Sequence, residues 1–167
     1  METKEYLGLN QTPSPDDFAS LEQEYGFTLP EDFKAHLLQH NGGWIRGGAA
    51  FVQPADESGN QPIRRLRNFK SVRYGTSTIE DSLEDFGGEL HPDLVPFGSE
   101  SGGDVFVLSV GPEDYGSVYY VAHELYTPPA FLEEDAAAPP REYGPGVFFL
   151  APSFTAFLTG LVTPTSA

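Results

Sequence analysis

The strongest constraint on the fold is a double set of helix start and stop signals between residues 14 and 43. Ser14 can accept hydrogen bonds from the free amides at a helix N-terminus, and Pro15 suits the first helical position. Gly26 then ends this helix, and Pro30 opens a second one that ends at an Asn-Gly-Gly sequence. The punctuation therefore predicts two short helices joined by a tight elbow.

Both predicted helices carry an apolar stripe on one side. Apolar residues recur at intervals of three and four, which is the period of a helix with one buried face. The stripes are Phe18, Leu21 and Tyr25 in the first helix and Phe33, Leu37 and Leu38 in the second. Each helix must therefore lie against a core that the rest of the chain supplies.

The remaining segments predict a β-sheet and two further helices. Short apolar runs bounded by turn residues indicate strands, of which the second is irregular, at 49–52, 63–69, 94–97, 105–108 and 117–122, and the run at 147–150 indicates a last buried segment. The turns at 98–104 and 111–116 would join three of them into an antiparallel meander. Helices are expected after Ser77 or Thr78 and after Ser153, which can serve as caps. The predicted class is α+β, with the N-terminal helix pair and the C-terminal helix packed on a mostly antiparallel β-sheet.

The size and the apolar content of the chain predict one folded domain. Because domains commonly contain about 100 to 150 residues, a single domain is expected over residues 1–167. Segments near 53–61 and 128–144 lack apolar periodicity and are expected to be mobile loops. No apolar stretch approaches about 18 residues, and no basic start precedes an apolar run, so a cytoplasmic location is expected.

Net charge is the second informative feature of the chain. The sequence contains 25 acidic and 9 basic residues, which gives a net charge of −16, and five of the basic residues fall between Arg64 and Arg73. Such a charge repels DNA, RNA and anionic membranes, whose binding draws on a positive surface, and it attracts basic proteins. The alternative is that the acidic surplus serves only to keep the protein dissolved.

Each catalytic or cofactor pattern in the chain lacks a residue that its chemistry needs. Residues 98–103 have the glycine spacing of a phosphate-binding loop, but Asp104 stands in place of the required lysine, and Glu100 occupies the serine position of a hydrolase elbow. His36 and His40 have metal-ligand spacing on one helix but no third ligand, so they are expected on the helix surface. The chain contains no cysteine. We therefore expect no catalytic residues, no cofactor and no metal.

Three stretches of the chain resemble one known family. The order Glu-x-x-Tyr-Gly-Phe-Thr-Leu-Pro-x-x-Phe-Lys, followed by Leu-Leu and Asn-Gly-Gly, resembles the opening signature of the SUKH superfamily, the homologues of the yeast cell-wall synthesis regulator Smi/Knr. Two later stretches, one that runs through 95–108 and on to 118–124 and the closing one at 150–158, are similar to further parts of that pattern, whereas 55–73 and 128–144 are not. Because many bacterial members are immunity proteins, the resemblance implies a binding function and the fold given above.

The sequence and the resemblance together predict a non-enzymatic binding module. Its expected role is that of an immunity protein that binds and neutralises a cognate toxin, with a basic nuclease as the favoured kind of partner. Tyr119 and Tyr120 alternate along a strand, so one is expected in the core and the other at a surface or groove. The residues expected to contact the partner are Glu80, Asp81, Glu84 and Asp85 of the third helix, Glu100, Asp104, Glu113 and Asp114 in the meander's turns, and Trp44 with Tyr119 or Tyr120 as anchors.

Two alternatives to this function remain open at the level of sequence. The first is a regulatory scaffold that binds a partner of its own cell, as the yeast relatives do. The second, which the sequence favours less, is a small hydrolase that uses His123 with Glu124 or Asp104. A catalytic role for His123 would need a cleft in which a perturbed carboxylate meets it, whereas the simpler explanation is that it ends a strand.

Overall fold

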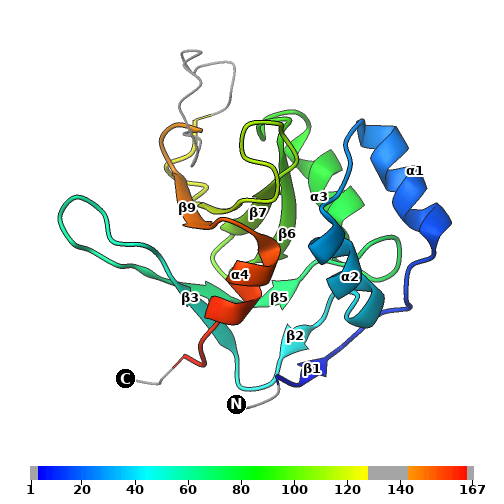
Figure 1. The fold of residues 1–167 in the computed structure, drawn as a ribbon, viewed down its shortest axis with the longest axis horizontal. Coiled ribbons are helices and arrows are strands. Elements are labelled where there is room, and N and C mark those ends of the chain that lie inside the picture. The colour runs from blue at the N-terminus through cyan, green and yellow to red at the C-terminus, as the bar shows by residue number, and fades with distance from the viewer. Residues whose placement is uncertain (1–3, 128–142, 165–167) are drawn as a thin grey trace.

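The computed structural model describes residues 4–127 and 143–164. Within these ranges the helices are α1 (Pro15–Tyr25), α2 (Glu31–Gln39), α3 (Ile79–Phe86) and α4 (Phe154–Gly160). The strands are β1 (Tyr6–Leu7), β2 (Trp44–Ile45), β3 (Ala49–Val52), β4 (Ile63–Leu66), β5 (Asn68–Phe69), β6 (Leu94–Ser99), β7 (Val105–Ser109), β8 (Val118–Val121) and β9 (Val147–Ala151). The predicted α+β class is confirmed (Figure 1).

The helices begin and end where their capping residues predict. Ser14 and Asp17 form a reciprocal capping box, because the Asp17 amide donates to Ser14 Oγ at 3.2 Å and the Ser14 amide donates to Asp17 Oδ2 at 2.8 Å. Gly26 ends α1 with φ of 73°, a left-handed conformation that favours glycine. Thr78 caps α3 and Ser153 caps α4. Local chemistry therefore fixes the positions of the helices.

The main sheet is an antiparallel meander of five strands in the order β5-β6-β7-β8-β9. Two short ladders accompany it, formed by β1 with β2 and by β3 with β4. The irregular strand expected at 63–69 divides between two sheets, since β4 pairs with β3 and β5 pairs with β6. Arg67 lies at the corner between them, where its backbone amide donates to the Ser99 carbonyl at 2.8 Å. The predicted meander is thus confirmed, and it is extended at both edges.

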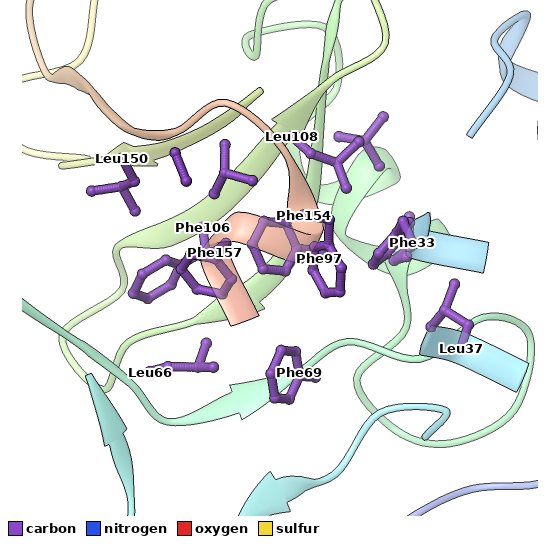
Figure 2. Packing of buried hydrophobic residues seen from close by; sticks show 14 of the residues in the cluster. Phe33, Leu37, Leu66, Phe69, Phe97, Phe106, Leu108, Leu150, Phe154 and Phe157 are labelled. Atoms are coloured by element: carbon purple, nitrogen blue, oxygen red, sulfur yellow. The ribbon is translucent and has the colours of Figure 1, made fainter. Parts of the chain in front are cut away.

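One face of the main sheet carries a core rich in phenylalanine (Figure 2). Helix α4 packs against α2, β3 and β9, so that Phe154 and Phe157 meet Phe97 and Phe106 of the sheet. The ring centroids of Phe33 and Phe154 lie 4.8 Å apart in an edge-to-face contact. Complete burial of one such side chain contributes about 1.5–3 kcal/mol to stability. This core positions the helix pair on the sheet.

A smaller apolar cluster covers the opposite face of the sheet. It contains Leu94, Val107 and Tyr119, with Tyr143 from the segment that precedes β9. Tyr119 is therefore only 1% exposed, while Tyr120 points into the main core and is 3% exposed. The prediction that one of these tyrosines faces a surface is wrong, because both faces of the sheet are covered. Neither tyrosine is available as an anchor for a partner.

His36 also departs from its expected place. Its side chain is 7% exposed, and its ring packs against Tyr6, Phe69 and Phe154 with centroid distances of 5.0–5.6 Å. Burial, with a smaller contribution from His40, lowers the pKa of His36 to about 3. The expectation of two surface histidines is wrong for His36, since the N-terminal strand β1 and α4 enclose this side of α2.

Of the two loops expected to be mobile, the structure describes one in full and only the end of the other. The segment 53–61 connects β3 to β4 and carries a turn in which the Asp56 side chain accepts from the Ser58 and Asn60 amides. Most of the segment 128–144 lies outside the described residues. Its described end includes Tyr143, which is buried in the smaller cluster. The mobility of both segments stays a prediction.

Candidate partner-binding face

The acidic residues predicted to bind a partner fall in several separate places. Because turns of an antiparallel meander alternate between its ends, the turn with Glu100 and Asp104 lies at one end of the sheet and the turn with Glu113 and Asp114 at the other. The second end also holds the segment that follows α3, since the Val110 amide donates to the Asp93 carbonyl at 2.7 Å. The structure therefore does not bring the predicted carboxylates into one patch.

Four of them do gather on α3, together with one residue of α1. Burial raises the pKa of Tyr25, and the charges of Glu24, Glu84, Glu80 and Asp81 raise it further. These carboxylates therefore lie near enough to the Tyr25 phenol to act on its charge, and the phenol hydroxyl lies 3.5 Å from the Glu80 carbonyl oxygen. We call Glu24, Glu80, Asp81, Glu84 and Asp85 the acidic face. Sequence analysis missed Glu24, because only the packing of α1 beside α3 places it there.

Within the described part of the chain, most of the acidic face lacks ion-pair partners. Asp81, Glu84 and Asp85 are exposed on α3, and no lysine or arginine there lies within ion-pairing distance of them or of Glu24. Lys70 is near enough to sense the charges of Asp85 and Asp81, but it is buried, and burial lowers its pKa. The negative charge of this face is thus largely uncompensated.

Glu80 differs from its neighbours on the acidic face. Its carboxylate accepts a hydrogen bond from the Arg73 amide at 2.8 Å and is partly buried. Burial raises the pKa of Glu80, and the charges of Asp81 and Glu24 act in the same direction, whereas the backbone hydrogen bonds lower it. Glu80 therefore has a role in holding the turn before α3, while Glu24, Asp81, Glu84 and Asp85 remain open to solvent.

An apolar hollow of about 330 Å³ lies beside these carboxylates. Its wall contains the rings of Tyr25 and Phe27, which stack with centroids 6.2 Å apart and planes 14° apart. Leu83 and Phe86 of α3 and Leu90 form more of its lining. We call it the aromatic hollow. An apolar depression beside a rim of charge is the usual anatomy of a protein-binding site, in which buried anchors supply most of the affinity.

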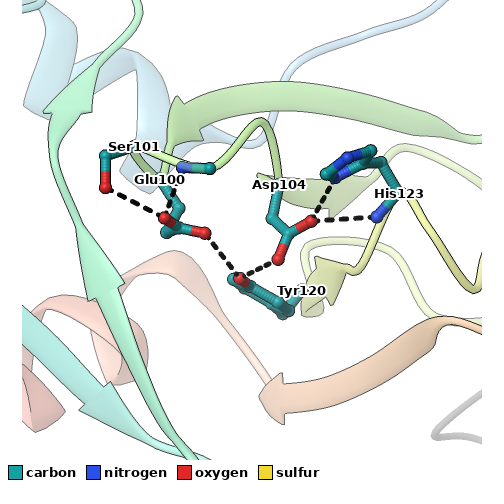
Figure 3. Close-up of polar contacts among 6 residues, drawn as sticks. Glu100, Ser101, Asp104, Tyr120 and His123 are labelled. Atoms are coloured by element: carbon teal, nitrogen blue, oxygen red, sulfur yellow. Dashed lines mark hydrogen bonds and ion pairs between the residues drawn. The ribbon is translucent and has the colours of Figure 1, made fainter.

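Two of the turn acids predicted to bind a partner, Glu100 and Asp104, are already bonded within the fold (Figure 3). Asp104 accepts hydrogen bonds from the Tyr120 hydroxyl, from the His123 amide at 3.0 Å and from His123 Nδ1, which lies 2.6 Å away. Burial acts to raise the pKa of Asp104, but the bonds from Tyr120 and His123 outweigh it and lower that pKa. The Tyr120 hydroxyl also lies 3.4 Å from Glu100. This cluster ties the β6–β7 turn to the end of β8.

The same cluster contains the His–Asp pair that a hydrolase would need, but it has no serine or threonine nucleophile beside that pair among the described residues. His123 Nδ1 contacts Asp104, and no serine or threonine hydroxyl in the described residues is bonded to the His123 ring. Ser101 Oγ donates instead to Glu100 at 3.1 Å. A nucleophile next to the base, which this chemistry requires, is not part of the arrangement among the described residues.

The prediction that Asp114 contacts a partner is wrong. Asp114 is 5% exposed and accepts hydrogen bonds from Ser109 Oγ at 2.5 Å and from the hydroxyls of Tyr119 and Tyr143. The carboxylate therefore organises the smaller cluster from inside, because buried hydroxyls need acceptors. Glu113, the next residue along the chain, is exposed. Contact of Glu113 with a partner stays a prediction.

Trp44 is exposed, as expected for an anchor, but it belongs to another part of the surface. It lies on β2 with 48% of its surface exposed, and it lines a second hollow together with Arg67. Its role in binding a partner also stays a prediction.

Neither a metal site nor a membrane-spanning helix is found within residues 4–127 and 143–164. No group of three His, Cys, Asp or Glu side chains in these ranges could hold a metal ion. No helix in them has the length and apolar character needed to cross a membrane.

Comparison with known proteins places the chain in a family. The SMI1 / KNR4 family (SUKH-1) matches residues 12–160, which is most of the chain and includes the four helices found in the described residues. No curated protein matches the sequence. The family match covers both α1 and α3 and therefore the whole acidic face.

Proposed function

Because the chain belongs to the SMI1 / KNR4 family (SUKH-1), we propose that it is an immunity protein, which binds and neutralises a toxin of basic charge. One observation carries the proposal, namely a group of carboxylates without ion-pair partners among the described residues, which lies beside an apolar hollow. A fold gains nothing from like charges held together, so their presence beside a hollow favours a role in binding.

The arrangement supports a two-step association. The net charge of −16 and the acidic face attract a basic partner over a distance, which speeds the encounter. A lysine or arginine side chain of the partner then packs its apolar stem in the aromatic hollow, with its cation over the Tyr25 and Phe27 rings and close to Glu24 and Glu84. Binding of this kind neutralises a toxin by covering its active surface, and it requires no reaction.

Capture from the native host tests the proposal. The wild-type protein, immobilised on beads, should retain a basic protein that is toxic to cells lacking this chain, and co-expression should restore their growth. A Glu24→Gln, Glu84→Gln double variant should lose about tenfold or more in affinity, since it removes two carboxylates beside the hollow. A Glu57→Gln, Glu124→Gln double variant is the matched control, because it changes the net charge equally at exposed positions elsewhere.

Two outcomes would contradict the proposal in different ways. If both double variants bind the captured toxin as tightly as the wild type, the acidic face is not the binding site. If the captured partner is a harmless protein of the host, the immunity role is wrong, and the regulatory scaffold becomes the better interpretation.

A further inference from the structure

A second hollow, of about 710 Å³, lies on the surface next to the start of α3. It is lined by the segment after β1, by Trp44 of β2, by the β4–β5 corner with Arg67 and Asn68, and by Ser77 before α3. We call it the Trp44 hollow. Its volume falls within the range of about 300–1,000 Å³ that is typical of small-molecule sites.

The tryptophan that lines this hollow is held in place while it stays exposed. A Cβ atom at Gly8 would lie 2.1 Å from Trp44 Cζ3, so the indole ring rests directly on the Gly8 backbone. Gly8 also has φ of 67°, which favours glycine. An indole fixed in this way, with 48% of its surface exposed, offers a rigid flat face to a ligand.

The charge of the Trp44 hollow is opposite to that of the protein. Among the described residues, no acidic side chain lines it, although 25 of the 167 residues of the chain are acidic, and Arg67 is the one charged residue in the lining. Arg46 pairs with Glu5 at 2.5 Å and Arg73 with Asp17 at 3.3 Å, whereas Arg67 has no carboxylate partner in the described part of the chain. A guanidinium without a partner is suited to a bidentate contact with a carboxylate.

Several of the polar side chains that line this hollow are already hydrogen-bonded within the fold. The Asn68 amide donates to Ser77 Oγ at 3.4 Å and accepts a hydrogen bond from Ser99 Oγ. Asn10 lies at the margin, where its side-chain amide donates to the Asn41 carbonyl at 3.2 Å. These groups keep their positions without a ligand, so binding would cost little further ordering of the protein.

We propose that the Trp44 hollow binds a small molecule in which a ring carries a single carboxylate. The ring stacks on the Trp44 indole, the carboxylate accepts two hydrogen bonds from Arg67, and the hydroxyls of Ser77 and Ser99 contact polar groups of the ring. A single negative charge fits better than a phosphate dianion, because one arginine faces it and the rest of the surface is negative. This proposal is independent of the acidic face.

The chain offers a direct probe, because Trp44 is its only tryptophan. The intact protein is titrated with glucuronate and with phenylacetate, while the Trp44 emission and the NMR signal of its indole N–H are followed. Glucose and phenylacetamide are the uncharged counterparts, and inorganic phosphate tests whether a bare anion suffices. We expect a saturable response to at least one of the two acids and a much weaker response to all three controls.

The variants Arg67→Gln and Arg65→Gln distinguish a specific contact in the hollow from the general effect of removing one positive charge. Both arginines are exposed, so both variants should fold, but only Arg67 lines the hollow. Arg67→Gln should weaken binding of the acid about tenfold or more, and Arg65→Gln should leave it unchanged. A response to glucuronate alone identifies a sugar acid, and a response to phenylacetate alone an aromatic acid. The proposal is overturned if neither acid perturbs Trp44, if the uncharged counterparts or phosphate bind equally well, or if Arg67→Gln binds like the wild type.

Discussion

The acidic face and the carboxylates of Asp104 and Asp114 are built from the same residue types but differ in what contacts them. Asp104 and Asp114 accept several hydrogen bonds each and hold the turns and strands of the sheet together. Glu24, Asp81, Glu84 and Asp85 have no ion-pair partner within the described ranges. The two groups of acidic residues therefore differ in whether other residues of the fold already bond to their carboxylates. Stability should depend on the first group and binding on the second.

Lowering the pH should have the largest effect on the free energy of unfolding, because the buried His36 side chain must then bind a proton. His36 has a pKa of about 3 in the folded state and an ordinary value of 6.5, so the unfolded state binds more protons between these values. Stability should therefore fall as the pH drops from 6.5 towards 3, by roughly 4 kcal/mol in total. The lowered pKa of Asp104 acts in the same direction, but its contribution is lost only below the ordinary value of 3.8.

Urea unfolding at a series of pH values measures this effect, and His36→Leu is the variant to compare. Removing the imidazole should flatten the dependence between pH 6.5 and the titration of the carboxylates. An equally steep loss of stability in His36→Leu would contradict the assignment to His36.

Removal of the buried carboxylate should have the next largest effect. Asp114→Ala leaves the hydroxyls of Ser109, Tyr119 and Tyr143 without their shared acceptor in the interior, at an expected cost of about 3 kcal/mol. Denaturant unfolding measures it, and Glu84→Ala on the exposed face should change stability by no more than about 0.5 kcal/mol. Similar losses in the two variants would remove the distinction between the two groups of acids.

Tyr120→Phe should have a smaller effect, and it reports on Asp104 itself. The variant loses the hydroxyl that donates to Asp104, which should cost about 1 kcal/mol and raise the pKa of the Asp104 carboxyl. NMR titration of the side-chain carboxyl measures the shift. Tyr115→Phe is the matched control, because its hydroxyl donates to the Thr28 carbonyl instead. If Asp104 titrates identically in all three proteins, the hydrogen bond is not what lowers its pKa.

The Glu24→Gln, Glu84→Gln double variant should have the smallest effect on stability. Loss of two neighbouring negative charges should leave the free energy of unfolding unchanged or raise it by up to about 0.5 kcal/mol, because like charges repel. Thermal and urea unfolding beside the Glu57→Gln, Glu124→Gln control give the comparison. A loss of more than about 1 kcal/mol would mean that the acidic face stabilises the fold.

The local features of the fold were predictable from the sequence because local chemistry determines them. Each helix cap formed by Ser14, Thr78 or Ser153 needs only the amide three residues further along the chain, so neighbouring residues determine it. The turns of the meander likewise depend on local glycine-rich segments. The family match over residues 12–160 spans these capped helices and the meander. The features that short-range hydrogen bonds and periodicity determine were therefore confirmed.

The division of polar residues between interior and surface was not predictable, because it depends on contacts between distant segments. Asp114 and Tyr119 are buried because Tyr143, well separated from them in the chain, completes a second apolar cluster. His36 is buried because β1 closes over α2. Glu24 joins α3 only through the packing of the two helices. The spacing of apolar residues along a strand or helix shows which face is apolar, but it does not show whether a distant segment also covers the opposite face.

The association rate with the captured partner, measured across ionic strength, decides whether the acidic face recruits that partner. If uncompensated carboxylates attract a basic protein, the rate for the wild type should fall about tenfold between roughly 0.05 M and 0.5 M salt. The Glu24→Gln, Glu84→Gln variant should fall less steeply, and the Glu57→Gln, Glu124→Gln control should retain most of the wild-type slope. A rate that stays constant across this range would contradict recruitment by the acidic face.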